Sequence, residues 1–262
     1  MFEPRVALAS LSGESDAAWA RGATEYAGTA FMGGIAIDKT TREAAREMVE
    51  RDREEFLPPD PLAFVDDQLG ALADVPLRPA FNVRTTTLGP LWEAARICRE
   101  HGAILEVNAH CRQEEMCAVG CGESLLRDTD RLREYVSTAA GAGATVSVKV
   151  RTEVPGVDLP ALAETLAEAG ADAIHVDAMD SEPVVGGVVE AADAFVIANN
   201  GVRGETTVRE YLEYGADAVS VGRPSDNPVV LSRVHDASRA WFDDRDAGGD
   251  SADEADGREA QP

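Results

Sequence analysis

Lys149 is one of only two lysines among the 262 residues, and it lies inside a strand-like run of valines, Thr145–Arg151. Arginine carries almost all of the remaining positive charge. A compact ammonium group and a planar guanidinium group differ in their chemistry. We therefore interpret Lys149 as a functional residue that arginine could not replace. The alternative is a surface lysine on the polar face of an edge strand.

A second group of reactive side chains follows Leu105. Five residues separate Cys111 from Cys117, and three separate Cys117 from Cys121. This spacing matches neither paired zinc ligands nor the common iron–sulfur patterns, so no metal site is predicted. If the second half of this segment is helical, Cys117 and Cys121 share one face of that helix, as core residues or as ligands. Cys98 is interpreted as core packing. Only Cys111 directly follows a predicted strand.

Two glycine-containing pairs, Asn200–Gly201 and Gly222–Arg223, are suited to binding a phosphate. Glycine allows backbone N–H groups to approach an anion, and an arginine can bind the anion through two hydrogen bonds. One such pair alone would mean little. Together they predict a phosphorylated ligand or flavin mononucleotide (FMN).

The composition is strongly acidic, with 48 acidic against 24 basic residues and a formal net charge of −24. This predicts a salt-adapted cytoplasmic protein with an acidic surface, although an ordinary acidic protein remains an alternative. The charge opposes binding of a polyanion in dilute salt, but at about 1 M salt the Debye length falls to ~3 Å. The sequence shows no secretory signal at Met1 and no apolar run long enough to cross a membrane.

The reactive residues are distributed over a regular alternation of short apolar runs and longer amphipathic runs. Eight runs are predicted as strands. They are Val6–Ala9, Gly28–Met32, Pro79–Val83, Ile104–Val107, Val146–Val150, Ala173–Val176, Ala194–Ile197 and Ala218–Val221. Helices are predicted at Ser15–Tyr26, Thr41–Glu55, Leu88–His101, Thr129–Ala142, Leu159–Ala169, Thr206–Tyr214 and Asn227–Phe242.

Two nearly identical phrases support a repeated unit. Residues 169–176 and 214–221 each read as a helix end, a capping glycine, a tight turn and a buried parallel strand. Eight such units predict a (β/α)8 TIM barrel over residues 1–245, and a doubly wound sheet is the alternative. Residues 246–262 are predicted to form a disordered acidic tail.

In such a barrel the chemistry gathers where the strands end, so the reactive residues should meet on one rim. The two glycine-containing pairs follow the seventh and eighth predicted strands, which is the usual phosphate-binding corner of these barrels. The other predicted rim positions are Ser10, Gly33–Gly34, Asn82, Arg84, Asn108–Cys111, Lys149, Arg151, His175 and Asp177.

Six short motifs resemble those of the tRNA-dihydrouridine synthases in order and spacing. The resemblance covers Ile104–Pro228 well and the preceding residues loosely, and other FMN barrels such as dihydroorotate dehydrogenases share parts of it. The motifs are Asn108-x-x-Cys111, Gly120–Leu126, Val148–Arg151, Ile174–Val176, Val196–Val202 and Val221–Arg223.

The resemblance implies a flavin-dependent oxidoreductase that uses FMN, with NAD(P)H as the electron donor. Hydride from reduced FMN would reach C6 of a uracil ring while Cys111, the catalytic acid, protonates C5. Asn108 and Arg151 would contact the substrate. The implied cofactor-binding residues are Ser10, Asn82, Lys149, His175, Asn199, Asn200, Gly201, Gly222 and Arg223.

The chain departs from the family pattern at several positions. His110 and Arg112 replace a glycine and a proline of the cysteine motif, and Ser10 and Leu11 replace a Pro-Met pair. Family members carry a helical RNA-binding domain after the barrel, which we do not expect here. The substrate could therefore be tRNA or a small pyrimidine-like molecule. A barrel binding a phosphorylated metabolite without redox chemistry, with Lys149 forming a Schiff base, is a further alternative.

Overall fold

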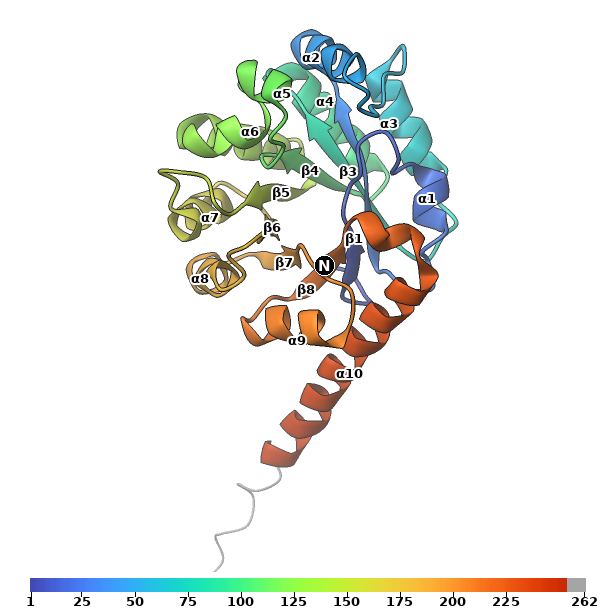
Figure 1. Ribbon diagram of the computed structural model, residues 1–262, viewed down its shortest axis with the longest axis vertical. Coiled ribbons are helices and arrows are strands. Elements are labelled where there is room, and N and C mark those ends of the chain that lie inside the picture. The colour runs from blue at the N-terminus through green and yellow to red at the C-terminus, as the bar shows by residue number, and fades with distance from the viewer. Residues whose placement is uncertain (254–262) are drawn as a thin grey trace, which may run out of the picture.

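Eight parallel strands close into a barrel in the computed structural model, which describes residues 1–253 and their side chains through Arg245. Each strand pairs with the next along the chain, and β8 pairs with β1 to close the sheet (Figure 1). The prediction of a (β/α)8 barrel is confirmed. The strands are β1 Val6–Leu8, β2 Thr29–Ala36, β3 Arg78–Arg84, β4 Ile104–Asn108, β5 Thr145–Arg151, β6 Ala173–Asp177, β7 Phe195–Asn199 and β8 Ala218–Val221.

Helices surround the barrel and pack their apolar faces on the strands (Figure 1). The α-helices are α1 Ala17–Arg21, α2 Lys39–Val49, α3 Pro61–Gly70, α4 Leu88–Glu100, α5 Glu114–Ala118, α6 Thr129–Gly141, α7 Leu159–Glu168, α8 Val184–Ala191, α9 Glu205–Glu213 and α10 Pro228–Asp253. Two short 3-10 helices are η1 Gly122–Arg127 and η2 Arg223–Asp226.

Some predicted boundaries were wrong. The helix predicted to reach Glu55 ends at Val49, because the chain turns at Asp52, whose φ of 59° is left-handed. The helix predicted over Ser15–Tyr26 is limited to α1. The second strand continues past Met32, since a bulge between Gly33 and Ile35 keeps it paired with β3.

Two helices of the barrel were not predicted. α3 begins after Asp60, whose side chain caps the backbone N–H groups of Leu62 and Ala63. This aspartate followed by proline is a helix-start signal that the sequence did contain. α8 is short and consists mostly of valine, alanine and glycine, so it lacks an amphipathic pattern. The cap predicted at Asp128 and the glycines predicted after α7 and α9 are confirmed.

The barrel interior changes from apolar to polar along the strands. Early positions of seven strands form an apolar plug with Phe2: Ala7, Phe31, Ala80, Ile104, Ala173, Ile197 and Ala218. Side chains on the same face of a strand recur every second residue, so the next inward positions lie one layer higher. These positions include the polar residues Asn82, Glu106, Ser147, His175 and Ser220, which are all buried. The plug therefore closes one end of the barrel, and polar chemistry begins above it.

α10 continues to Asp253, which lies within the segment predicted as an acidic tail. Residues 254–262 of that segment lie outside the described residues. Within the described chain, no helix is long and apolar enough to cross a membrane.

Candidate functional site

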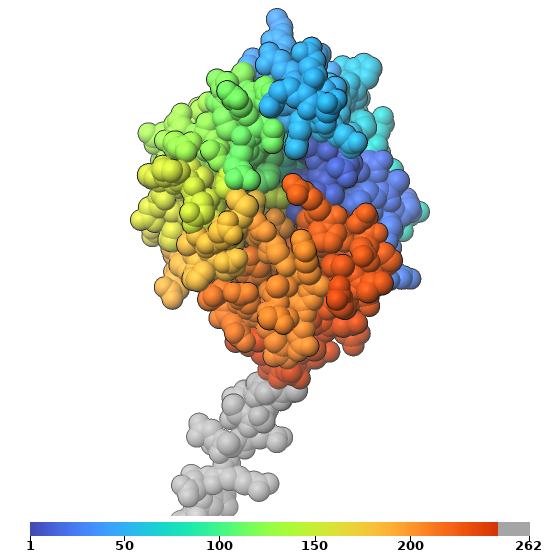
Figure 2. Space-filling model, in the orientation of Figure 1, coloured from blue at the N-terminus to red at the C-terminus, as the bar shows by residue number. Residues whose placement is uncertain are grey.

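Two adjoining cavities of about 540 and 340 Å³ open at the ends of the strands. The larger, here the cysteine cavity, is lined by Asn108 and Cys111. The smaller, here the glycine cavity, is lined by Lys149, Gly201 and Gly222. In the space-filling view, segments following β1, β4 and β8 meet around a hollow near the centre of the molecule (Figure 2). Both cavities share Ser10, Leu11, His110, Arg112, Asp177 and Arg223.

Most of the predicted site residues line these cavities. Three do not: Asn82 and His175 are fully buried within the barrel, and the guanidinium group of Arg151 is held elsewhere. Those that line one or both cavities are Ser10, Asn108, Cys111, Lys149, Asn199, Asn200, Gly201, Gly222 and Arg223.

Arg151 forms an ion pair and lines neither of these two cavities. Its Nη1 donates to Glu123 Oε2 at 3.0 Å, and its Nε donates to the carbonyl of Thr152 at 3.2 Å. Glu123 belongs to η1, which follows the segment that carries Cys111, residues 109–121, here called the cysteine loop. Arg151 therefore connects β5 to that loop.

The backbone of Cys111 is fixed from two sides. Its N–H donates to Asn108 Oδ1 at 3.2 Å, and its carbonyl accepts the N–H of Glu123 at 2.9 Å. Gly122 makes this approach possible, because a Cβ there would lie 2.3 Å from the Cys111 carbonyl oxygen, and its φ is +64°. The thiol residue is only 9% exposed and lines the cysteine cavity. The fold thus presents one nearly desolvated thiol to the cavity.

A chain of hydrogen bonds runs beneath the cavities. Asn108 Nδ2 donates to Asn82 Oδ1 at 2.8 Å, and Asn82 Nδ2 donates to Glu106 Oε1 at 2.7 Å. Glu106 Oε2 contacts His175 Nδ1 at 2.7 Å, and His175 Nε2 contacts Ser220 Oγ at 2.7 Å. The network thus joins β3, β4, β6 and β8 in the polar layer of the barrel.

Protonation in this network follows from its donors and acceptors. Burial acts to raise the pKa of Glu106, but His175, Lys149 and Asn82 together bring it below its ordinary value. Burial lowers the pKa of His175, opposed by Glu106. The pair is therefore a carboxylate and a neutral imidazole. His175 donates through Nδ1 to Glu106, and Nε2 accepts the Ser220 hydroxyl proton.

Lys149 lies at the floor of the glycine cavity and is only 2% exposed. Among the described residues, its ammonium group forms no ion pair and no hydrogen bond. Burial lowers the pKa of Lys149, and the carboxylates of Glu106 and Asp177 act in the opposite direction. Burying an amine without a direct partner is costly, so a ligand that accepts its hydrogen bonds would be stabilised there.

The other end of the glycine cavity has room for an anion. No atom lies within 4 Å of the Cβ position at Gly201 or Gly222, so the backbone there is open to a ligand. Arg203 and Arg223 line the same cavity. Asn200, with a φ of 103°, is held by a 2.9 Å hydrogen bond from its Nδ2 to Asp177 Oδ1. The cavity therefore combines a buried lysine with two arginines beside an open backbone, a set that fits a flavin ring and its phosphate.

The profile of the dihydrouridine synthase (Dus) family matches residues 83–253. The chain belongs to this family. Its members are FMN-dependent oxidoreductases. The match includes β4 to β8, and thus the segments that supply Asn108, Cys111, Lys149 and both glycine pairs.

The chain is also similar to an uncharacterized protein, MJ0144, of Methanocaldococcus jannaschii. The two are 25% identical over 235 residues, covering 85% of this chain and 89% of the relative.

Solved structures with the same fold are more distant in sequence. One is FabK of Thermotoga maritima, with a TM-score of 0.53 and 14% identity. The alignment covers 84% of this chain and 61% of the FabK chain. Another is a chain of the tryptophan synthase complex of Pyrococcus furiosus, with a TM-score of 0.56 and 12% identity. The alignment covers 89% of this chain and 99% of that one. At these identities the likeness concerns the fold alone.

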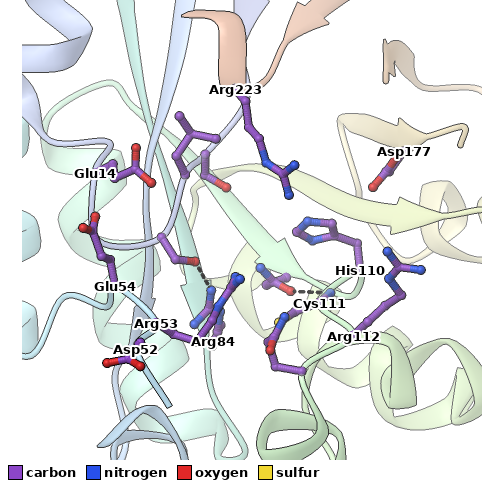
Figure 3. A pocket seen from close by; sticks show the side chains of 15 residues that line it. Glu14, Asp52, Arg53, Glu54, Arg84, His110, Cys111, Arg112, Asp177 and Arg223 are labelled. Carbon is purple, nitrogen blue, oxygen red and sulfur yellow. Dashed lines mark hydrogen bonds between the residues drawn. The ribbon is translucent and has the colours of Figure 1, made fainter. Parts of the chain in front are cut away.

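Two residues that depart from the family's cysteine motif lie directly at the site. His110 and Arg112 line both cavities (Figure 3). Burial, reinforced by the charge of Lys149, keeps the pKa of His110 well below its ordinary value. His110 was among the predicted rim positions but, like Arg112, was given no role in the site. Their positions flanking Cys111 were the signal that they belong to the site.

Glu106 was missed altogether. A glutamate inside the apolar run of β4 was a visible signal, because a buried carboxylate needs partners. The remaining cysteines line neither cavity: burial raises the pKa of both Cys98 and Cys121 to about 12. No cluster of three metal-ligating side chains occurs in the part of the chain that the structure describes.

Proposed function

We propose that the protein binds FMN in the glycine cavity and reduces the C5–C6 double bond of a uracil ring held in the cysteine cavity. The observation that carries this proposal is Lys149, a buried lysine in the glycine cavity whose ammonium group has no partner among the described residues. Such a group suits the N1/O2 edge of a flavin, where negative charge develops on reduction. The open backbone at Gly201 and Gly222 suits the FMN phosphate.

The chain's own residues would divide the remaining work. Bound FMN would supply the hydride for C6 of the ring. The nearly buried thiol of Cys111 would donate its proton to C5 as a general acid. Asn108 fixes the backbone N–H of Cys111 through Oδ1, so it positions the thiol. Asn82 and His175 would act from beneath by holding Asn108 and Glu106 in place.

The first test is the visible absorption spectrum of the purified protein. We expect bound flavin, or uptake of added FMN, and bleaching by NADH or NADPH under anaerobic conditions. Lys149→Met should weaken FMN binding roughly tenfold or more, since it removes a charge-assisted hydrogen bond. Lys39→Met is the matched control, because Lys39 is the other lysine and its side chain is 89% exposed. A colourless protein that takes up no FMN would refute the proposal.

The second test concerns the reaction. Cys111→Ala should retain flavin absorbance but lose formation of the dihydrouracil ring, measured on tRNA, uridine and uracil substrates. Full activity of this variant would exclude Cys111 as the acid. Borohydride trapping with carbonyl compounds tests whether Lys149 forms a Schiff base instead, which would favour a barrel without redox chemistry.

A further inference from the structure

Four arginines line the two cavities with guanidinium groups that form no ion pair and no hydrogen bond with any described residue. All four are exposed, so water can satisfy them, and they stay available to a ligand although the chain has 48 acidic against 24 basic residues. Neighbouring arginines do find them: Arg84 pairs with Glu55, and Arg151 pairs with Glu123. The four are Arg53, Arg112, Arg203 and Arg223.

These arginines divide between the cavities. Arg203 lines only the glycine cavity. Arg223 directly follows Gly222, where the backbone is open to a ligand, so both arginines suit the FMN phosphate. Arg53 lines only the cysteine cavity, whereas Arg112 lines both. Arg112 also directly follows Cys111, and Figure 3 shows it beside His110. Of the two arginines not assigned to the phosphate, Arg53 and Arg112, only Arg112 adjoins Cys111 in the chain, and its guanidinium group has no partner among the described residues.

Two buried polar atoms around the cysteine cavity are also unsatisfied. His110 Nδ1 and Arg84 Nε have no hydrogen-bond partner in the part of the chain that the structure describes, and both residues line this cavity. The Arg84 side chain is only 3% exposed. Leaving such atoms unpaired costs free energy, which a polar ligand would recover. A polar ligand in this cavity would therefore offer hydrogen-bond partners to these two atoms.

We propose that Arg112 binds the carboxylate or phosphate of a small uracil-type substrate in the cysteine cavity. This rests on the proposed function for the uracil ring and adds the substrate class and the residue that selects it. An arginine can bind either anion through two parallel hydrogen bonds. Neutral uracil or uridine offers Arg112 no charged partner.

The surroundings favour a small anion over a nucleic acid. Glu14, Asp52 and Glu54 line the mouth of the same cavity, as Figure 3 shows, and all three are exposed. The chain as a whole carries a formal charge of −24. A polyanion would have to pass these carboxylates along its length, whereas a small anion meets them only on entry.

The test is calorimetric titration of the purified, FMN-loaded protein with two matched pairs of probes. Uridine 5′-monophosphate against uridine tests a phosphate, and orotate against uracil tests a carboxylate. We expect one anionic probe to bind about tenfold or more tightly than its neutral counterpart. Arg112→Gln should abolish that preference while FMN affinity is retained.

The matched control is Arg46→Gln, an exposed arginine of α2 that also forms no ion pair but lies outside both cavities. It should keep the full preference for the anion. The inference is overturned if neither anion is preferred, if Arg112→Gln keeps the preference, or if that variant loses FMN affinity instead. It is also overturned if only tRNA binding depends on Arg112. Failure to bind FMN is seen separately as a colourless protein, so it refutes the proposed function and not this preference.

Discussion

Glu106 is the residue on which the floor of the site depends. Both of its carboxylate oxygens accept hydrogen bonds: Oε1 from Asn82, and Oε2 from His175 and Ser147. The residue is fully buried, so these donors replace water completely. Asn82 Oδ1 in turn accepts a hydrogen bond from Asn108. The orientation of both side-chain amides is therefore determined by the Glu106 carboxylate.

Glu106→Gln should therefore destabilise the protein although it conserves volume. The new amide N–H group must face a donor on one side or the other. This donor–donor conflict is removed only if the His175 proton moves from Nδ1 to Nε2 or the Asn82 amide rotates by about 180°. Replacing a buried charged acceptor typically costs about 2–4 kcal/mol, so we expect a loss of that order in the free energy of unfolding.

Urea unfolding followed by circular dichroism measures this loss. Glu93→Gln is the control, because Glu93 is a half-exposed glutamate on α4 that also pairs with an arginine. It should leave the midpoint nearly unchanged. Equal effects of the two substitutions would show that the interior network contributes no special stability.

The segment from β4 through α5 to η1 is the element that presents the thiol. Cys111 leaves β4 at Asn108, and η1 returns to contact its carbonyl. Gly122, at the start of η1, lets the two backbones come together. The glycine motif that resembled the family is thus a packing requirement of the cysteine loop.

Gly122→Ala should displace this loop. The added methyl group would meet the Cys111 carbonyl oxygen, and the left-handed φ of +64° disfavours alanine. We expect a loss of about 2 kcal/mol or more in unfolding free energy, together with faster reaction of Cys111 with a thiol reagent. Gly89→Ala on α4 is the control, since no atom lies within 4 Å of its Cβ position. Unchanged reactivity would mean that η1 does not hold the thiol.

At the scale of the whole molecule, the charge of −24 dominates the surface. Many of its ion pairs are exposed, such as Arg239 with Asp243, and pairs of this kind contribute little. Self-repulsion of the uncompensated carboxylates therefore opposes the compact state, and salt reduces that repulsion.

The melting temperature should consequently rise between about 0.1 and 1 M KCl, as the Debye length falls from ~10 to ~3 Å. Differential scanning calorimetry measures this directly. A melting temperature that stays constant or falls over this range would contradict a destabilising surface charge. Parallel titration with FMN shows whether the site itself needs salt.

Within the site, the order of strands and the glycine pairs were readable from the sequence. Lys149 and Cys111 are adjacent to strand ends, and a barrel brings all strand ends to one rim. The sequence did not predict that the side chains of Asn82, His175 and Arg151 lie outside the two cavities. Whether a polar residue near a strand end faces the cavity or the interior depends on the stagger between neighbouring strands. Arg151 is drawn away by Glu123, 28 positions earlier in the chain.

The sequence by itself determined the barrel, because buried parallel strands and amphipathic helices are local patterns that repeat along the chain. It also predicted a phosphate-binding corner after β7 and β8, since that prediction follows from strand order alone. Only the tertiary structure decided which polar groups are satisfied inside the barrel and which face the cavity unpaired. Hydrogen bonds and ion pairs join residues distant in sequence, and their geometry exists only after the barrel has closed.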